Sequence, residues 1–173
     1  TVGALEARLT ALEEGAMCVA LSSGTSAVMY SLINIMSQGD NFVTANQLYG
    51  GTYTMFDNIL PEYGIDSKKV DITDLAAVEN AIDDKTRAIY CETITNPGLV
   101  VADISALSEI AHSKGIPLIV DATFTTSAIL KPFEYGADIV VYSLTKWMSG
   151  HGRVIAGAVI EKGGFDWGNG NFP

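Results

Sequence analysis

Cysteine is scarce in this sequence, and the two cysteines present do not form a thiolate metal centre. Cys18 and Cys91 lie in separate apolar runs, far apart along the chain. Neither belongs to a CxxC pair or to a Cys/His grouping with the spacing of a zinc site. We therefore expect no metal site, and we expect both cysteines to be reduced residues of the core.

Basic residues are also few. Lysine and arginine total 10 against 20 aspartates and glutamates, which gives a net charge of -10. Such a charge repels nucleic-acid phosphates and anionic membrane surfaces, so we expect neither as a partner. The chain opens without the basic and then apolar pattern of a secretory leader, which favours a cytoplasmic location.

Residues 15–39 carry no charge, a length that invites a membrane-spanning interpretation. The hydroxyl-rich run Ser22–Ser26 interrupts the stretch, however, and such a run is typical of a loop. A strand, a loop and a buried helix therefore explain it better. The composition of 48% hydrophobic and 17% charged residues is that of a folded chain. No repeat or linker divides residues 1–173, so we expect one domain.

Apolar residues alternate between the spacings of helices and of short buried strands. Strands are predicted at 17–21, 42–45, 87–91, 116–121, 138–143 and 154–160. Helices are predicted at 2–14, as an amphipathic helix, and around 28–36, 53–60, 75–82 and 104–111. This alternation predicts an α/β fold: a mostly parallel sheet with helices on both faces.

Ligands bind such sheets at the carboxyl ends of the strands, and polar residues follow four of the predicted strands. The run Ser23-Gly24-Thr25 lies between a strand and a helix, where backbone N–H groups form an anion site suited to phosphate. The alternative is a simple helix cap or turn. Glu92 and Asn96 follow a second strand, and Asp121 ends a third.

Lys146 follows the predicted strand at 138–143, directly after the hydroxyl pair Ser143 and Thr145. A lysine there can act as a nucleophile or form a Schiff base, although most lysines are simply solvated. For Asp121 the choice is between a turn cap and a partner for a pyridinium nitrogen.

These residues lie in motifs that resemble one family. The segment DIVVYSLTKWMSGHG, residues 138–152, resembles the lysine signature of the Cys/Met-metabolism enzymes that depend on pyridoxal 5'-phosphate (PLP). Further motifs of that family follow in order over nearly the whole chain: SGT at 23–25, LYGGT at 48–52, ETITNP at 92–97 and VDATF at 120–124. The resemblance implies the PLP-binding large domain of the fold type I transferases.

The resemblance also implies a role for each site residue. Lys146 would hold the cofactor covalently, and Tyr49 would stack on the ring and assist proton transfer. Asp121 would meet the pyridine nitrogen, while Asn96 would reach the ring hydroxyl. The remaining implied cofactor contacts are Gly24, Thr25, Ser143 and Thr145 at the phosphate, Thr123 at the ring, and Glu92 nearby. Ala122, Leu144 and Arg153 depart from residues that are frequent in the family.

The segments LYGGTYTMF, 48–56, and GGFDW, 163–167, resemble O-acetylhomoserine sulfhydrylases more than cystathionine enzymes. Gly51 stands where methionine γ-lyases usually carry cysteine. The expected reaction is γ-replacement on an O-activated homoserine by sulfide or a thiol, giving homocysteine or methionine. A γ-lyase, cystathionine γ-synthase or catalytically silent phosphate-ligand module are the alternatives.

The resemblance further implies a homo-oligomer, a dimer of dimers. The family's upstream tyrosine and arginine, which reach the phosphate of a neighbouring subunit, and its carboxyl-terminal domain have no counterpart in these 173 residues. We therefore expect residues 1–173 to form part of the large domain and to be inactive by themselves.

Overall fold

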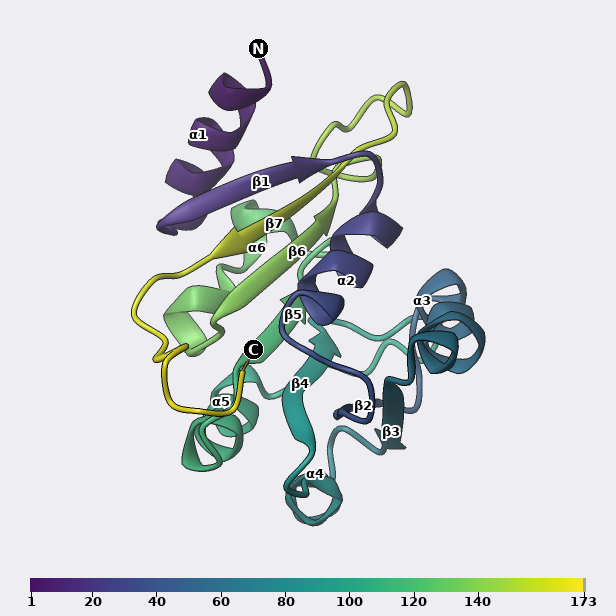
Figure 1. Cartoon of the computed structure of the whole chain (residues 1–173). Coiled ribbons are helices and arrows are strands. Elements are labelled where there is room, and N and C mark those ends of the chain that lie inside the picture. The colour runs from purple at the N-terminus through teal and green to yellow at the C-terminus, as the bar shows by residue number, and fades with distance from the viewer. Residues whose placement is uncertain (173) are drawn as a thin grey trace.

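A seven-stranded sheet forms the centre of the computed structural model, which describes residues 1–172 (Figure 1). Its strand order is β1-β7-β6-β5-β4-β2-β3. The strands are β1 (Met17–Leu21), β2 (Asn41–Ala45), β3 (Asp66–Val70), β4 (Thr86–Glu92), β5 (Leu118–Asp121), β6 (Ile139–Ser143) and β7 (Gly157–Glu161). Strand β7 runs antiparallel to both of its neighbours, β1 and β6, and the other pairs are parallel. The carboxyl ends of the other six strands therefore lie at one edge. The predicted mostly parallel α/β sheet is confirmed.

Helices cover both faces of this sheet, as the alternation of side chains along β6 demonstrates. Ser143 approaches the start of α2 (Gly24–Ile33), whereas Tyr142 points the opposite way and donates a hydrogen bond to Glu13 of α1 (Val2–Glu13). Figure 1 shows α2 in front of the sheet. The other helical elements are α3 (Gly50–Thr54), η1 (Met55–Ile59), η2 (Leu60–Tyr63), α4 (Leu75–Ala81), α5 (Ile104–Ser113), α6 (Thr126–Ile129) and η3 (Pro132–Tyr135).

The core lies between the sheet and these helices. Every residue of β2 is buried, and so are most of β4 and β5, because both faces of the central strands are covered. Phe56 packs edge-on against Phe42 at 4.7 Å and against Tyr90 at 5.2 Å, which fixes the η1 segment over the sheet. Cys18 and Cys91 are buried and free, as predicted.

Three details differ from the sequence predictions. The charged edge strand β3 was not expected, because its sequence DSKKV lacks an apolar run; it pairs only with β2. The last strand begins at Gly157 rather than Val154, and Val154 is exposed. Helix α1 forms but buries only Leu9 and Glu13. Its other apolar side chains, including Leu5 and Leu12, are exposed, so the expected apolar face is not buried.

The helix predicted around 53–60, just before Pro61, also differs. Helix α3 is followed by one wide turn, η1, and then by a tight turn, η2. Pro61 lies in the first turn of η2, so it does not end the helical segment. Proline is compatible with these positions because its missing N–H would have no helical partner there.

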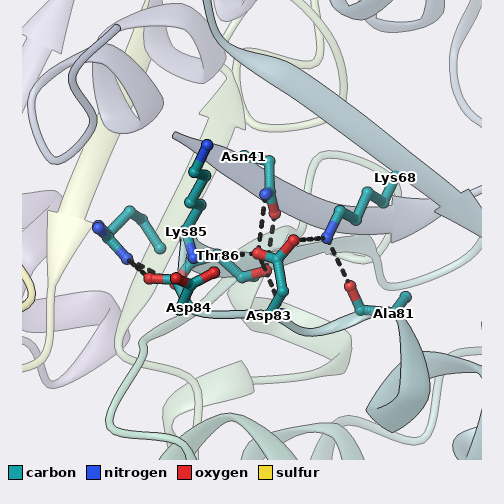
Figure 2. A network of polar contacts seen from close by, with 8 residues as sticks. Asn41, Lys68, Ala81, Asp83, Asp84, Lys85 and Thr86 are labelled. Carbon is teal, nitrogen blue, oxygen red and sulfur yellow. Dashed lines mark hydrogen bonds and ion pairs between the residues drawn. The ribbon is translucent and has the colours of Figure 1, made fainter. Parts of the chain in front are cut away.

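A polar network joins β2, β3 and β4 at the edge of the sheet opposite the carboxyl ends (Figure 2). Asp83 is its centre: its carboxylate accepts hydrogen bonds from Asn41 at 2.9 Å, from Lys68 at 2.6 Å and from the Lys85 N–H at 3.0 Å. The Thr86 hydroxyl donates to Asn41 at 2.7 Å. The network therefore ties the beginnings of β2 and β4 to β3.

Candidate functional site

One cavity of about 670 Å³ opens at the carboxyl ends of β4, β5 and β6, beside the start of α2. This volume lies within the range of cavities that hold small-molecule ligands. All of the site residues proposed from the sequence line it: Gly24, Thr25, Tyr49, Glu92, Asn96, Asp121, Thr123, Ser143, Thr145 and Lys146. They converge because the strands that precede them run in the same direction.

The first end of the cavity is formed by the start of α2. Ser23 caps this helix, since its side chain accepts a hydrogen bond from the Ser26 N–H at 3.0 Å. The N–H groups of Gly24 and Thr25 belong to the first turn and have no helical acceptor. A Cβ atom on Gly24 would lie 2.5 Å from Ser143 Cβ, so glycine is what allows the helix to approach β6 this closely. This end of the cavity therefore offers neutral donors and a positive helix dipole to an anion.

Thr145 and Thr123 fix the backbone around this end. The Thr145 hydroxyl exchanges hydrogen bonds with the backbone of Ala156, at 3.2 and 3.3 Å. Thr123 Oγ1 accepts from the Ser143 N–H at 2.7 Å, which joins the loop after β5 to the end of β6. Both threonines thus organise the loops that surround the cavity.

Two acidic side chains lie next to each other at the ends of β4 and β5. Glu92 and Asp121 are direct neighbours in the strand register. Asp121 accepts hydrogen bonds from the Thr123 N–H at 2.9 Å and from the Tyr90 hydroxyl at 3.3 Å. Burial raises the pKa of Asp121, because the charged form loses its hydration. A cationic group placed beside this carboxyl would favour its ionised form.

Glu92 is almost completely buried, with 6% of its surface exposed. One carboxylate oxygen accepts the Tyr49 N–H at 2.7 Å, and the other accepts the Asn96 N–H at 3.1 Å. Burial raises the pKa of Glu92 to about 7, and the neighbouring Asp121 adds to this increase. Through these two hydrogen bonds, Glu92 contacts two backbone segments, at Tyr49 and at Asn96.

Lys146, Tyr49 and Asn96 have exposed side chains at the mouth of the cavity. Lys146 lies in the turn after β6, where its N–H donates to the Ser143 carbonyl at 3.2 Å. The Tyr49 ring lies close to Gly51, since a Cβ atom there would be 2.8 Å from Tyr49 Cε1. An amine, a phenol and a carboxamide thus surround the opening.

Sequence reasoning did not assign several other residues that line the cavity. Most of them are apolar side chains or glycines in loops, and no spacing rule distinguishes these from ordinary loop residues. They are Val28, Thr52, Ile94, Phe124, Trp147, Gly150, Gly152 and Ile155. The family motifs contain Thr52, Ile94, Phe124, Trp147, Gly150 and Gly152, and this was the signal that could have identified them.

Residues 1–172 carry neither a metal-binding cluster nor a membrane-spanning helix. No group of three or more His, Cys, Asp or Glu side chains in this part of the chain is arranged to hold a metal ion. Among the same residues, no helix is both long and apolar enough to cross a membrane.

Comparison with known sequences gives two findings. A family model described as Cys/Met metabolism PLP-dependent enzyme matches residues 1–172. The O-acetyl-L-homoserine sulfhydrylase of Leptospira meyeri is 45% identical over 172 residues, which are 99% of this chain and 39% of that relative. The chain therefore spans well under half the length of this relative.

Comparison with solved structures gives the same fold. A structure from Campylobacter jejuni that carries N'-pyridoxyl-lysine-5'-monophosphate has a TM-score of 0.94 and 39% identity, covering 97% of this chain and 42% of that one. Cystathionine γ-lyase from Lactobacillus plantarum, solved with L-serine, has a TM-score of 0.87 and 40% identity, covering 92% and 42%. The Campylobacter structure is described as a putative O-acetylhomoserine (thiol)-lyase, so proteins named for different reactions share this fold.

Proposed function

We propose the function of this protein from one premise: the chain belongs to the Cys/Met metabolism PLP-dependent enzyme family. On that premise the cavity binds PLP, and the whole protein catalyses γ-replacement on an O-activated homoserine. Sulfide or a thiol forms the new bond to Cγ and acetate leaves, so that homocysteine or methionine is produced. The observation that carries the proposal is that Lys146, Asp121 and the start of α2 line one cavity.

The residues at the α2 end fit the phosphate of this cofactor. The N–H groups of Gly24 and Thr25 point from a helix start, where an anion is stabilised by the helix dipole. Ser143 and Thr145 line the same cavity; the Thr145 hydroxyl holds the Ala156 backbone beside it, and the Ser143 hydroxyl would add a further hydrogen-bonding group. A Cβ atom on Gly24 would overlap Ser143, so glycine keeps the helix start next to that residue.

The residues at the other end fit the ring. PLP, when bound, supplies an electron sink for the charge that develops at the substrate's α-carbon. The Asp121 carboxylate would hold a proton on the ring nitrogen; burial raises the pKa of Asp121, and the cationic ring nitrogen would favour its ionised form. Thr123, Asn96 and Glu92 line the same cavity, so Thr123 and Asn96 would contact the ring.

Lys146 and Tyr49 are the proposed catalytic residues. The Lys146 amine would tether the cofactor and would take the proton from the substrate's α-carbon. Tyr49 would stack on the ring and assist this proton transfer. Both side chains lie at the open mouth of the cavity, where an amino-acid substrate arrives.

A second candidate is γ-elimination, because cystathionine γ-lyase shares the fold at 40% identity. Gly51 favours replacement, since methionine γ-lyases usually carry cysteine at this position.

We further propose that the whole protein is a homo-oligomer, a dimer of dimers, and acts in the cytoplasm. An amino acid and a sulfide or thiol are its small-molecule partners, as the name of the Leptospira relative supports.

The test uses the whole protein loaded with PLP. O-acetylhomoserine with sulfide should give homocysteine and acetate, whereas cystathionine or methionine alone should release little 2-oxo acid and ammonia. Lys146→Ala should remove both activities, and borohydride reduction followed by mass spectrometry should locate the pyridoxyl group on Lys146 in the unmodified protein. Rapid 2-oxo acid release without homocysteine would favour elimination, and a pyridoxyl group on another lysine would refute the assignment of Lys146.

A further inference from the structure

Glu92 connects two segments that are distant in the sequence. Its Oε1 accepts the N–H of Tyr49, the residue that precedes α3, and its Oε2 accepts the N–H of Asn96 in the loop after β4. Both acceptor oxygens are therefore used by the backbone. A carboxylate that accepts two backbone N–H groups binds them more strongly than a neutral acceptor does.

The same two segments also touch through Gln47 and Gly98. A Cβ atom on Gly98 would lie 1.5 Å from the Gln47 side-chain oxygen, so this glycine lets the two segments pack closely. Tyr49 and Asn96 themselves have exposed side chains that line the cavity. The position of each side chain thus depends on how the two segments are held together.

We propose that Glu92 is a positioning residue that holds the Tyr49 segment against the Asn96 segment at the mouth of the cavity. The proposal rests on the proposed function, because the cofactor ring is what Tyr49 and Asn96 would contact. Glu92 acts through the two backbone hydrogen bonds that its oxygens accept. This role differs from the direct cofactor contact that the family resemblance implied.

The clamp depends on the ionisation of Glu92. A protonated carboxyl keeps one acceptor oxygen, while its other oxygen becomes a donor and cannot accept an N–H in the same way. One of the two backbone N–H groups then loses its partner. The ionisable groups near Glu92 are Asp121 on β5, Tyr90 and Cys91 on β4, and Lys146 and Tyr49, which line the same cavity.

The test measures hydrogen exchange at the Tyr49 and Asn96 backbone amides in the whole protein without PLP. In Glu92→Gln, the side-chain NH₂ faces one of the two N–H groups, so that amide should exchange roughly 10- to 100-fold faster after correction for intrinsic rates. Glu109→Gln, an exposed substitution on α5, is the matched control and should leave both amides unchanged. The unmodified protein should lose protection at one of these amides as the pH falls below about 7.

A PLP titration then separates the possible outcomes. Glu92→Gln should bind PLP more weakly, and the difference from the unmodified protein should disappear as the pH falls below about 7. Weaker PLP binding with unchanged amide exchange would overturn the proposal and make Glu92 a direct contact. If the unmodified whole protein does not bind PLP, the proposed function fails, whereas the exchange result still decides the clamp. If Glu92→Gln does not fold, the pH dependence of exchange in the unmodified protein is decisive, and pH-independent protection would refute the clamp.

Discussion

Gly24→Ala should disturb the start of α2 more than its small size suggests. The added Cβ would lie 2.5 Å from Ser143 Cβ and 2.8 Å from Ser143 Cα. Carbon atoms pack at about 3.5–4.0 Å, so the helix start or the end of β6 must move by roughly 1 Å. Overpacking of this kind costs about 1–3 kcal/mol. The loss of backbone freedom in the unfolded chain offsets about 0.4–1 kcal/mol, which leaves a net destabilisation of about 1–2 kcal/mol.

Gly50→Ala is the matched control. Gly50 is also the first residue of a helix beside the cavity, but a Cβ there meets nothing within 4 Å. Urea denaturation should therefore rank Gly50→Ala as equal to or more stable than the unmodified protein, and Gly24→Ala as the least stable. Gly24→Ala should also weaken PLP binding by more than about 10-fold, because charge-stabilising N–H groups move away from the phosphate. Equal stability and equal PLP affinity of the two variants would refute the close-approach argument.

Three further predictions concern other sites. Asp83→Ala should lower the free energy of unfolding by about 1 kcal/mol, since its bonds are partly exposed, while Asp84→Ala should not; equal urea midpoints would contradict the role of the network. Burial raises the pKa of Glu13, so the native state keeps a proton that the unfolded state releases. Stability should then fall as the pH rises from about 4.5 through the raised pKa, and Glu13→Gln should flatten that part of the curve; an unchanged slope would exclude Glu13. Gly51→Cys should turn the Tyr49 ring, which a crystal structure would reveal, and an unmoved ring would contradict the contact.

Much of the fold could be predicted because burial and apolar runs coincide in the central strands. Strands such as β5 and β6 are apolar on both faces, and their sequences are too short for helices. The edge strand β3 lacks this signal, since its sequence DSKKV has a single strongly apolar residue and its residues are mostly half-buried. The run Val154–Ile160 shows the reverse error, because Val154 and Ile155 are apolar yet exposed near the cavity.

The site could be located from the sequence because parallel strands bring their carboxyl ends together. That rule brings Asp121 and Lys146 to one edge, whatever the details of the loops between them. The hydrogen bonds that organise the site follow no such rule. The contact of Glu92 with the Tyr49 N–H spans 43 residues, and the contact of Tyr142 with Glu13 spans 129. Such pairs result from tertiary packing, which no local pattern in the chain records.

Asp121 and Glu13 are two acids whose pKa burial raises, but they differ in their access to the cavity. Burial raises the pKa of both Asp121 and Glu13, and in each case a tyrosine hydroxyl donates to the carboxylate, Tyr90 to Asp121 and Tyr142 to Glu13. Within residues 1–172, Glu13 Oε2 is buried without a hydrogen-bond partner, and Glu13 does not line the cavity at the carboxyl ends of the strands. Asp121, by contrast, lines that cavity, where a cation beside the carboxyl would favour its ionised form. Burial therefore raises the pKa of an acid of α1 that does not line the cavity and of an acid at the end of β5 that does.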